Sequence, residues 1–165
     1  ETYNVPVEMA ETRYGIRVDE HSLHTDGAGA GEFCGGSGAV RTYRSMNENQ
    51  TFTASFGRNK WPVWGAAGGK DGSINYFQFI DADGAVSEPA GIVARRVMNT
   101  NDVVRMVTAT GGGYGNPLKR PAEKVAMDAK NEYITVEQAK EDYGVLLDPD
   151  TFAVLGFTEE RQRAE

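Results

Sequence analysis

The chain has 165 residues, of which 39% are hydrophobic and 25% are charged, and its formal net charge is −7. This length allows one domain with a sizeable core but not two ordinary domains, and the composition argues against wholesale disorder. The acidic balance, without any Lys/Arg-rich run, argues against a nucleic-acid partner, and no apolar stretch approaches the roughly 20 residues that cross a bilayer.

Cysteine usage and the start of the chain bear on its cellular setting. Cys34 is the single cysteine, so no internal disulfide can form, and no signal peptide is evident. We therefore expect a cytoplasmic protein without a membrane segment. The sequence begins at Glu1 rather than Met, which predicts a processed amino terminus or a piece of a longer polypeptide.

The first two thirds of the chain show the patterns of β-strands. An ordered segment is expected at Val5–Val7, and Tyr14, Ile16 and Val18 alternate with charged residues as in a half-buried strand. Asn47–Asn49 is expected to be a hairpin loop between two alternating segments. The predicted strands after the first are Ala39–Tyr43, Gln50–Phe56, Ile74–Ile80, Ile92–Met98 and Val103–Ala109.

The pattern becomes helical after Pro117. Pro121 is expected in the first turn of one helix, and Thr135 with Gln138 predicts a capping box at the start of a second. Thr158 is expected to cap a short polar terminal helix. The fold class is therefore α+β: a mostly β-strand body over residues 1–117, sandwich-like or barrel-like, and a short C-terminal helical tail over residues 118–165 of the same domain.

The most unusual segment is the loop over residues 61–72, which carries both tryptophans and a Gly-Gly-Lys. A glycine loop with a lysine can hold phosphate, but the spacing does not match a P-loop. An aromatic loop packed against a partner chain is the favoured alternative, because tryptophan is a common interface anchor. The candidate substrate or interface residues are Trp61, Trp64, Gly68, Gly69 and Lys70.

A second glycine segment covers residues 110–117. It ends a predicted strand and no helix follows at once, so a dinucleotide-binding loop is excluded by context. We expect a structural turn that needs small residues and positive φ angles. Its glycines are Gly111, Gly112, Gly113 and Gly115.

The residues that most often bind metals or act as nucleophiles are sparse. His21 and His24 fall on opposite faces of a strand, and with one cysteine they cannot complete a closed zinc site. Cys34 has no evident general base nearby, so a buried inert thiol is expected. No metal site and no catalytic residue is assigned within this chain.

Taken in order, several segments resemble the carboxy-terminal part of the hydantoinase B/oxoprolinase family. The resemblance extends from about Asn4 to Asp150. Its segments are Asn4–Glu8, Gly27–Phe33, Gly35–Gly38, Trp64–Lys70, Thr110–Pro117 and Tyr133–Leu147.

The resemblance implies an enzyme that works as a hetero-oligomer. Members pair with a hydantoinase A-type subunit that binds ATP, and they open hydantoins, 5-oxoproline and related lactams or carboxylate acetone and acetophenone. ATP would phosphorylate the carbonyl or enolate oxygen, which makes a poor leaving group into a good one. ATP and a divalent metal are then expected on other chains or on the remainder of a hydantoinase B-type subunit, and the isolated chain is expected to be inactive.

Two alternatives stay open beside that interpretation. The chain is a non-catalytic module that stabilises such a complex through Trp61 and Trp64, or a free-standing domain that binds small anions through Gly68–Lys70. The sequence does not separate the hydrolase from the carboxylase.

Overall fold

The computed structural model describes residues 4–164. The backbone falls into two compact units, each assembled from three separate stretches of chain. Unit 1 combines Glu1–Leu23, Ala39–Lys60 and Asn75–Thr108, and unit 2 combines His24–Gly38, Trp61–Ile74 and Ala109–Glu165. The predicted single domain with a boundary after residue 117 stays a prediction.

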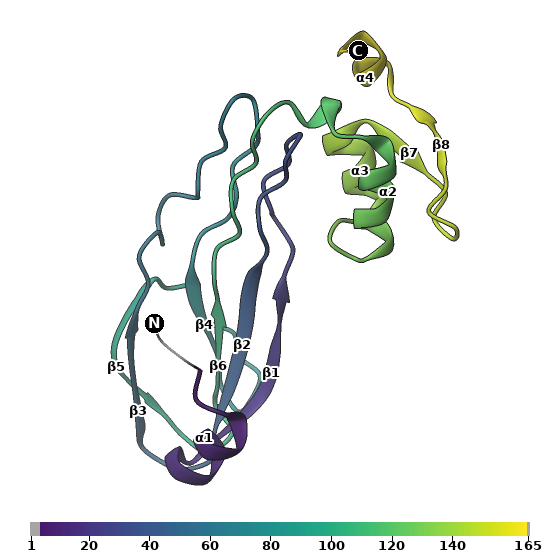
Figure 1. Cartoon of the computed structure of the whole chain (residues 1–165). Coiled ribbons are helices and arrows are strands. Elements are labelled where there is room, and N and C mark those ends of the chain that lie inside the picture. Colours follow the sequence, from purple (N-terminus) through teal and green to yellow (C-terminus); the bar gives the residue numbers. More distant parts are fainter. Residues whose placement is uncertain (1–3, 165) are drawn as a thin grey trace. The chain divides into compact units, whose positions relative to one another are not determined.

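The larger sheet of unit 1 has four strands in the order β1-β2-β6-β4 (Figure 1). Strand β6 pairs antiparallel with both β2 and β4, so Val107 lies beside Val40 on one side and Tyr76 on the other. Strand β2 alternates buried and half-buried side chains, which is the pattern of a strand between two layers. The strands are β1 (Ile16–His24), β2 (Gly38–Ser45), β4 (Tyr76–Ile80) and β6 (Val103–Val107).

The second sheet of unit 1 is the antiparallel pair of β3 (Gln50–Ser55) and β5 (Ile92–Met98). Residues from both sheets share one core, in which the aromatic rings interlock. Phe77 is fully buried and stacks on Phe56 with ring centroids 4.3 Å apart, while Phe52 meets it edge-on at 5.5 Å. The sheets stay open, so the strand body is a two-layer packing rather than a barrel.

The expected hairpin around Asn47–Asn49 is wrong. The segments on either side are strands, but β2 pairs with β6 and β3 pairs with β5. Asn49 has a positive φ of 56° and its N–H donates to Asn99 Oδ1, so this turn carries the chain from one sheet to the other.

A short helix α1 (Val7–Tyr14) precedes the first strand and was not predicted. It begins after Pro6, without a side-chain cap, and ends at Gly15, whose φ of 61° suits glycine. Tyr14, expected at the start of a strand, is instead the last helical residue. The strand begins two residues later at Ile16.

Unit 2 holds the helical tail, and its main features agree with the sequence. Thr135 and Gln138 form the predicted capping box, and Gly144 ends the helix with a φ of 65°. Pro121 is the N-cap of its helix rather than a first-turn residue. The elements are η1 (Pro117–Lys119), α2 (Ala122–Lys130), α3 (Val136–Tyr143), β7 (Val145–Leu147), β8 (Val154–Phe157) and α4 (Glu159–Ala164).

Two buried arginines join the elements of unit 2. Arg161 of α4 donates to the backbone carbonyls of Tyr143, at 2.8 Å, and Arg120, at 2.7 Å, and it lies over the Phe157 ring. Arg120 pairs with Asp128 at 2.7 Å and donates to the carbonyl of Glu32 at 3.0 Å. These contacts stabilise the helix ends, where carbonyl groups lack helical partners.

The structure confirms the predicted α+β class with a mostly β-strand body and a C-terminal helical tail. Over residues 4–164, none of the helices is both long and apolar enough to cross a bilayer.

Candidate functional site

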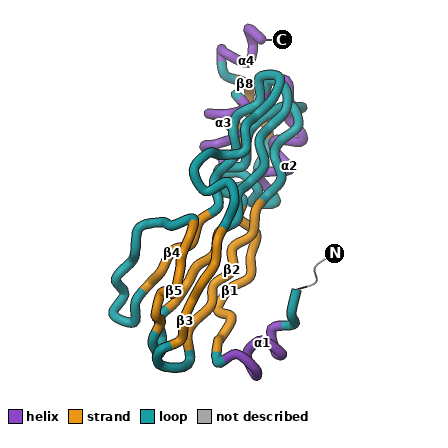
Figure 2. The backbone as a smooth tube through the Cα atoms, turned by 90° about the vertical axis from the view of Figure 1, so that its left-hand side faces the viewer, coloured by secondary structure: helices purple, strands orange, loops and turns teal. Residues whose placement is uncertain are grey.

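The most distinctive part of unit 2 is a bundle of three glycine-rich segments, residues 24–38, 61–74 and 109–117, here called the glycine bundle. These segments run alongside one another as extended chain, drawn as loops in Figure 2. The sequence predicted each of them as a separate loop. The structure brings them together, although they are far apart along the chain.

Backbone hydrogen bonds join all three segments of the glycine bundle. Gly29 N–H donates to the Gly111 carbonyl at 2.9 Å, and Lys70 N–H donates to the Ala30 carbonyl at 2.7 Å. Gly113 N–H in turn donates to the Lys70 carbonyl at 2.9 Å. Each segment therefore satisfies the polar groups of its neighbours, as the backbone of a packed region must.

The glycines are required because the backbones touch one another. A Cβ atom on Gly69 would overlap the carbonyl oxygen of Gly113, and one on Gly113 would overlap the carbonyl oxygen of Ala30. The expectation of a positive-φ turn is wrong for Gly111, Gly112 and Gly113, whose φ angles are not positive, and right for Gly115, at 77°. The close approach of neighbouring backbones, rather than a left-handed turn, explains why three glycines stand in a row at residues 111–113.

The hydroxyl groups of buried Thr110 and half-buried Ser73 close one end of the glycine bundle. Thr110 is 1% exposed, and its Oγ1 donates to the Gly27 carbonyl at 2.8 Å and accepts the N–H of Ser73 at 2.9 Å. The N–H of Thr110 donates to Ser73 Oγ at 2.9 Å. One residue from each segment thus takes part in this network.

The candidate anion-binding loop uses its polar groups internally. Gly69 N–H donates to the Ala66 carbonyl at 2.9 Å, and the N–H of Lys70 is bonded to Ala30. The Lys70 ammonium pairs with Asp142 of α3 at 2.5 Å. A phosphate at this loop would have to displace these contacts, so the geometry does not favour a phosphate site at Gly68–Lys70.

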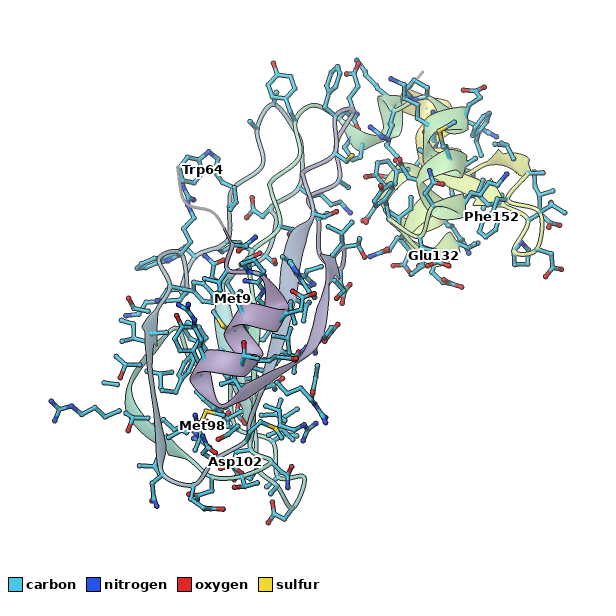
Figure 3. All side chains as sticks on the ribbon, turned by 60° about the horizontal axis from the view of Figure 1, so that its bottom comes forward. Met9, Trp64, Met98, Asp102, Glu132 and Phe152 are labelled. Atoms are coloured by element: carbon cyan, nitrogen blue, oxygen red, sulfur yellow. The ribbon has the colours of Figure 1, made fainter. Side chains whose placement is uncertain are left out.

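Large aromatic side chains of the glycine bundle are exposed. The exposed fractions are 75% for Trp61, 69% for Trp64, 59% for Phe33 and 58% for Tyr114. Figure 3 shows the Trp64 side chain pointing outward from its loop. Phe33 and Tyr114 exchange backbone hydrogen bonds and their rings lie 6.3 Å apart. Exposed aromatic side chains are typical of surfaces that contact another protein.

Trp64 also belongs structurally to the glycine bundle. A Cβ on Gly112 would overlap the Trp64 carbonyl oxygen, and Ala66 forms a parallel bridge with Tyr114. Trp64 is therefore anchored through its backbone while its indole faces outward.

Cys34 corrects a prediction. It lies in the glycine bundle beside Phe33, but its side chain is exposed rather than buried. Its neighbour Gly35 packs against the Gly111 backbone, so the chain is fixed at that point and the Cys34 side chain is left outside. His21 and His24 both lie on β1, as expected.

Perturbed ionisable groups in unit 2 have structural causes. Burial raises the pKa of Tyr143 to about 12, because the phenolate cannot be hydrated in the helical core. Hydrogen bonds from the backbone and hydroxyl of Thr151 and from the Asp150 N–H lower the pKa of Asp148, which forms a turn.

Within residues 4–164, no three His, Cys, Asp or Glu side chains are grouped so as to hold a metal ion.

The sequence did not predict two contacts of this region. The pairing of Phe33 with Tyr114 depends on the meeting of segments about 80 residues apart in a glycine-rich chain. The link from Arg120 to Glu32 depends on the same meeting. The signal for the first was an aromatic residue within a glycine-rich stretch of each segment, Phe33 in one and Tyr114 in the other.

The fold and the glycine bundle define a class: an α+β protein with a strand body and a bundle of backbone-packed glycine segments. The chain belongs to the hydantoinase B/oxoprolinase family, whose family model matches residues 1–117. This confirms the resemblance found in the sequence.

Two relatives have names that bear on function. The chain is 31% identical over 148 residues to a putative D-/L-hydantoinase subunit of the B type from Pseudomonas sp. (strain NS671), covering 88% of this chain and 25% of that protein. It is 30% identical over 148 residues to the beta chain of the caprolactamase of Pseudomonas jessenii, covering 86% of this chain and 25% of the relative. The chain thus spans about a quarter of the length of these relatives.

Solved structures share the fold. The ATP-dependent caprolactamase from Pseudomonas jessenii aligns with a TM-score of 0.74 and 28% identity, over 96% of this chain and 27% of that one. A nucleotide-free acetone carboxylase, described as performing ATP-dependent acetone carboxylation, aligns with a TM-score of 0.73 and 17% identity. The alignment covers 97% of this chain and 25% of that one. At that identity the second likeness concerns the fold alone.

Proposed function

We propose that this chain works within an ATP-dependent complex that hydrolyses a cyclic amide, a hydantoin or a lactam, and that the glycine bundle presents its aromatic face to another part of that complex. The observation that carries the proposal is family membership together with two relatives named for cyclic-amide hydrolysis. The carboxylase alternative rests on the family resemblance of the sequence, because the likeness to acetone carboxylase, at 17% identity, concerns the fold alone.

ATP fits the chemistry of such a complex but not the residues described here. Phosphorylation of the amide carbonyl oxygen would supply a good leaving group, which makes ring opening of an unreactive amide favourable. In this chain Lys70 is paired with Asp142, and no described cluster offers metal ligands. Binding of nucleotide and metal is therefore proposed for a hydantoinase A-type partner or for the remainder of a hydantoinase B-type polypeptide, in a hetero-oligomer.

The geometry favours a contact role for the glycine bundle over a catalytic one. Its backbone amides are bonded to one another, whereas its aromatic side chains at Phe33, Trp64 and Tyr114 are exposed. A backbone-packed bundle is rigid, so aromatic side chains mounted on it lose little conformational entropy when they are covered. The purely structural module is the second candidate, supported by the same exposed aromatic face.

The test uses the chain in the complex with which it co-purifies. We expect ATP hydrolysis that depends on a hydantoin or caprolactam and is independent of bicarbonate, and we expect no such activity from the isolated chain. Strict dependence on bicarbonate and a ketone would favour the carboxylase. Full activity of the isolated chain would refute the need for a complex.

Trp64→Ala tests the contact role, and Leu155→Ala, a 68% exposed apolar residue on β8, is the matched control. Loss of an aromatic hot spot is expected to weaken assembly by about 30-fold or more, measured as the dissociation constant of the complex. Leu155→Ala should assemble normally. Loss of turnover in an intact Trp64→Ala complex would place the loop at the active site instead.

A further inference from the structure

Unit 1 contains a cavity that the proposed contact role does not use. Its volume is about 530 Å³, and it lies where helix α1 and the segment before it meet the strands. In Figure 3 the helix α1, which carries the labelled Met9, is drawn in front of the strands. Cavities of 300–1,000 Å³ are typical of sites for small organic ligands.

Most of the lining of this cavity is apolar. The side chains come from α1, from both sheets and from the segment before α1, so several elements of one unit border the cavity, which is open to solvent on one side. The apolar lining includes Val5, Ala10, Val18, Tyr43, Phe52 and Met98.

Arg41 is the polar group that distinguishes the cavity. Its Nη1 donates to Asn4 Oδ1 at 3.2 Å, and its Nη2 lies 3.5 Å from His21 Nδ1. Its Nε is buried and has no hydrogen-bond partner in the described part of the chain. Among residues 4–164, no carboxylate forms a salt bridge with Arg41.

Arg44, the other arginine in the lining, shows the contrast. It pairs with Asp19 at 2.6 Å and donates to the Asn101 carbonyl. Its charge is therefore balanced within unit 1, whereas Arg41 has no carboxylate partner among residues 4–164 and lies near Asn4, His21 and the Tyr43 ring. An unpaired buried donor is costly, so an acceptor that reaches Arg41 gains more than an ordinary hydrogen bond.

We propose that this cavity binds a small carboxylate with an apolar body. The apolar part would lie among Val18, Phe52 and Met98, and the carboxylate would accept hydrogen bonds from the Arg41 guanidinium. The planar guanidinium suits a carboxylate, which it can hold through two parallel N–H groups. Because Nε lies beneath the surface, the side chain must turn toward the cavity to present it.

The probe is octanoate, titrated calorimetrically into the full chain, with octan-1-ol as the uncharged ligand of the same length. We expect one octanoate to bind per chain, at least about tenfold more tightly than octan-1-ol, because only the carboxylate pairs with Arg41. In NMR spectra the signals of Ala10, Val18 and Met98 should shift on binding.

Arg41→Gln should weaken octanoate binding by about tenfold or more and leave octan-1-ol binding unchanged. The control Arg163→Gln removes an equal charge from α4 in unit 2 and should bind octanoate like the natural chain. The proposal is overturned if octanoate does not bind at millimolar concentration, if Arg41→Gln binds it equally, or if the alcohol binds as well as the acid. If Arg41→Gln does not fold, the NMR spectra of the natural chain decide. The proposal is then overturned if the signals that shift on octanoate binding belong to residues outside the cavity.

Discussion

In unit 1 a core of aromatic and aliphatic side chains joins the two sheets, whereas in the glycine bundle of unit 2 the backbones themselves are in contact. Phe77 is buried among Phe52, Phe56 and other apolar groups of the core. Gly113, by contrast, lies against the backbone of Ala30 with no room for a methyl group. A glycine-rich segment can therefore be as tightly packed as an aromatic core, and the two kinds of packing are sensitive to opposite substitutions.

Removal of a large side chain should have its greatest effect in unit 1. Phe77→Ala is expected to lower the free energy of unfolding by about 3–5 kcal/mol, because it removes a fully buried ring and leaves a cavity. The measurement is chemical denaturation together with hydrogen exchange of amides in each unit. Val86→Ala, at a position that is 60% exposed in the same unit, should change stability by no more than about 0.5 kcal/mol.

Hydrogen exchange makes this first prediction a test of the comparison. Loss of protection confined to unit 1 would show that its side-chain core is a separate cooperative region. An equal loss in the glycine bundle would show that the two regions unfold together, and the contrast would then concern packing but not stability.

Addition of a methyl group should have its greatest effect in the glycine bundle. Gly113→Ala is expected to cost about 3 kcal/mol, because the new Cβ collides with backbone that cannot turn away. Chemical denaturation followed by circular dichroism measures the loss, and hydrogen exchange of the amides in residues 24–38, 61–74 and 109–117 locates it in the glycine bundle. The control is Gly36→Ala, because nothing lies within 4 Å of a Cβ at that position.

Two results would contradict the account of the bundle. If Gly113→Ala were as stable as Gly36→Ala, the close approach seen at Gly113 would not limit the packing. If Gly36→Ala were as damaging as Gly113→Ala, the glycines would be needed for their freedom in the backbone rather than for space.

The sequence predicted the elements that are specified locally. The apolar and β-branched pattern of Ile92–Met98 matches strand β5, and the Thr135–Gln138 capping box matches the start of α3. In both cases the signal lies within a few neighbouring residues. The family resemblance was also predictable, because each glycine segment is a short motif and the order of these motifs can be read directly from the sequence.

Features that depend on distant residues were not predictable. The turn at Asn47–Asn49 has the composition of a hairpin loop, but the partners of its flanking strands come from β5 and β6, about 50 residues later. Helix α1 lacks a side-chain cap and has only one buried residue, Ala10, so its pattern was weak. The short strands β7 and β8 are below the length at which alternation is informative.

The candidate site shows the same division. The glycine loops and both tryptophans were identified from the sequence, and the contact role of Trp61 and Trp64 stays a prediction. The exposure of Cys34 and the pairing of Lys70 with Asp142 follow from segments that meet only in the fold. Composition alone therefore located the glycine bundle but did not show that its backbone groups are bonded to one another.

A pH measurement sharpens the comparison within unit 2, where the helical core excludes water with side chains as unit 1 does. The pKa of Tyr143 is raised by burial from 10.0 to about 12, so the folded chain favours the neutral phenol. The neutral Tyr143 phenol makes its full contribution to the free energy of unfolding below pH 10. The contribution falls as the pH rises from 10 to 12, and about 2 kcal/mol is lost at pH 12. Urea denaturation of the natural chain and of Tyr143→Phe between pH 10 and 12 measures this loss of stability. The Tyr143→Phe variant should lose less stability than the natural chain. The control Tyr133→Phe, at a 45% exposed position, should follow the natural chain. Equal slopes for the natural chain and Tyr143→Phe would mean that the phenol ionises without opening the core, so that this part of unit 2 is less tightly packed than the aromatic core of unit 1.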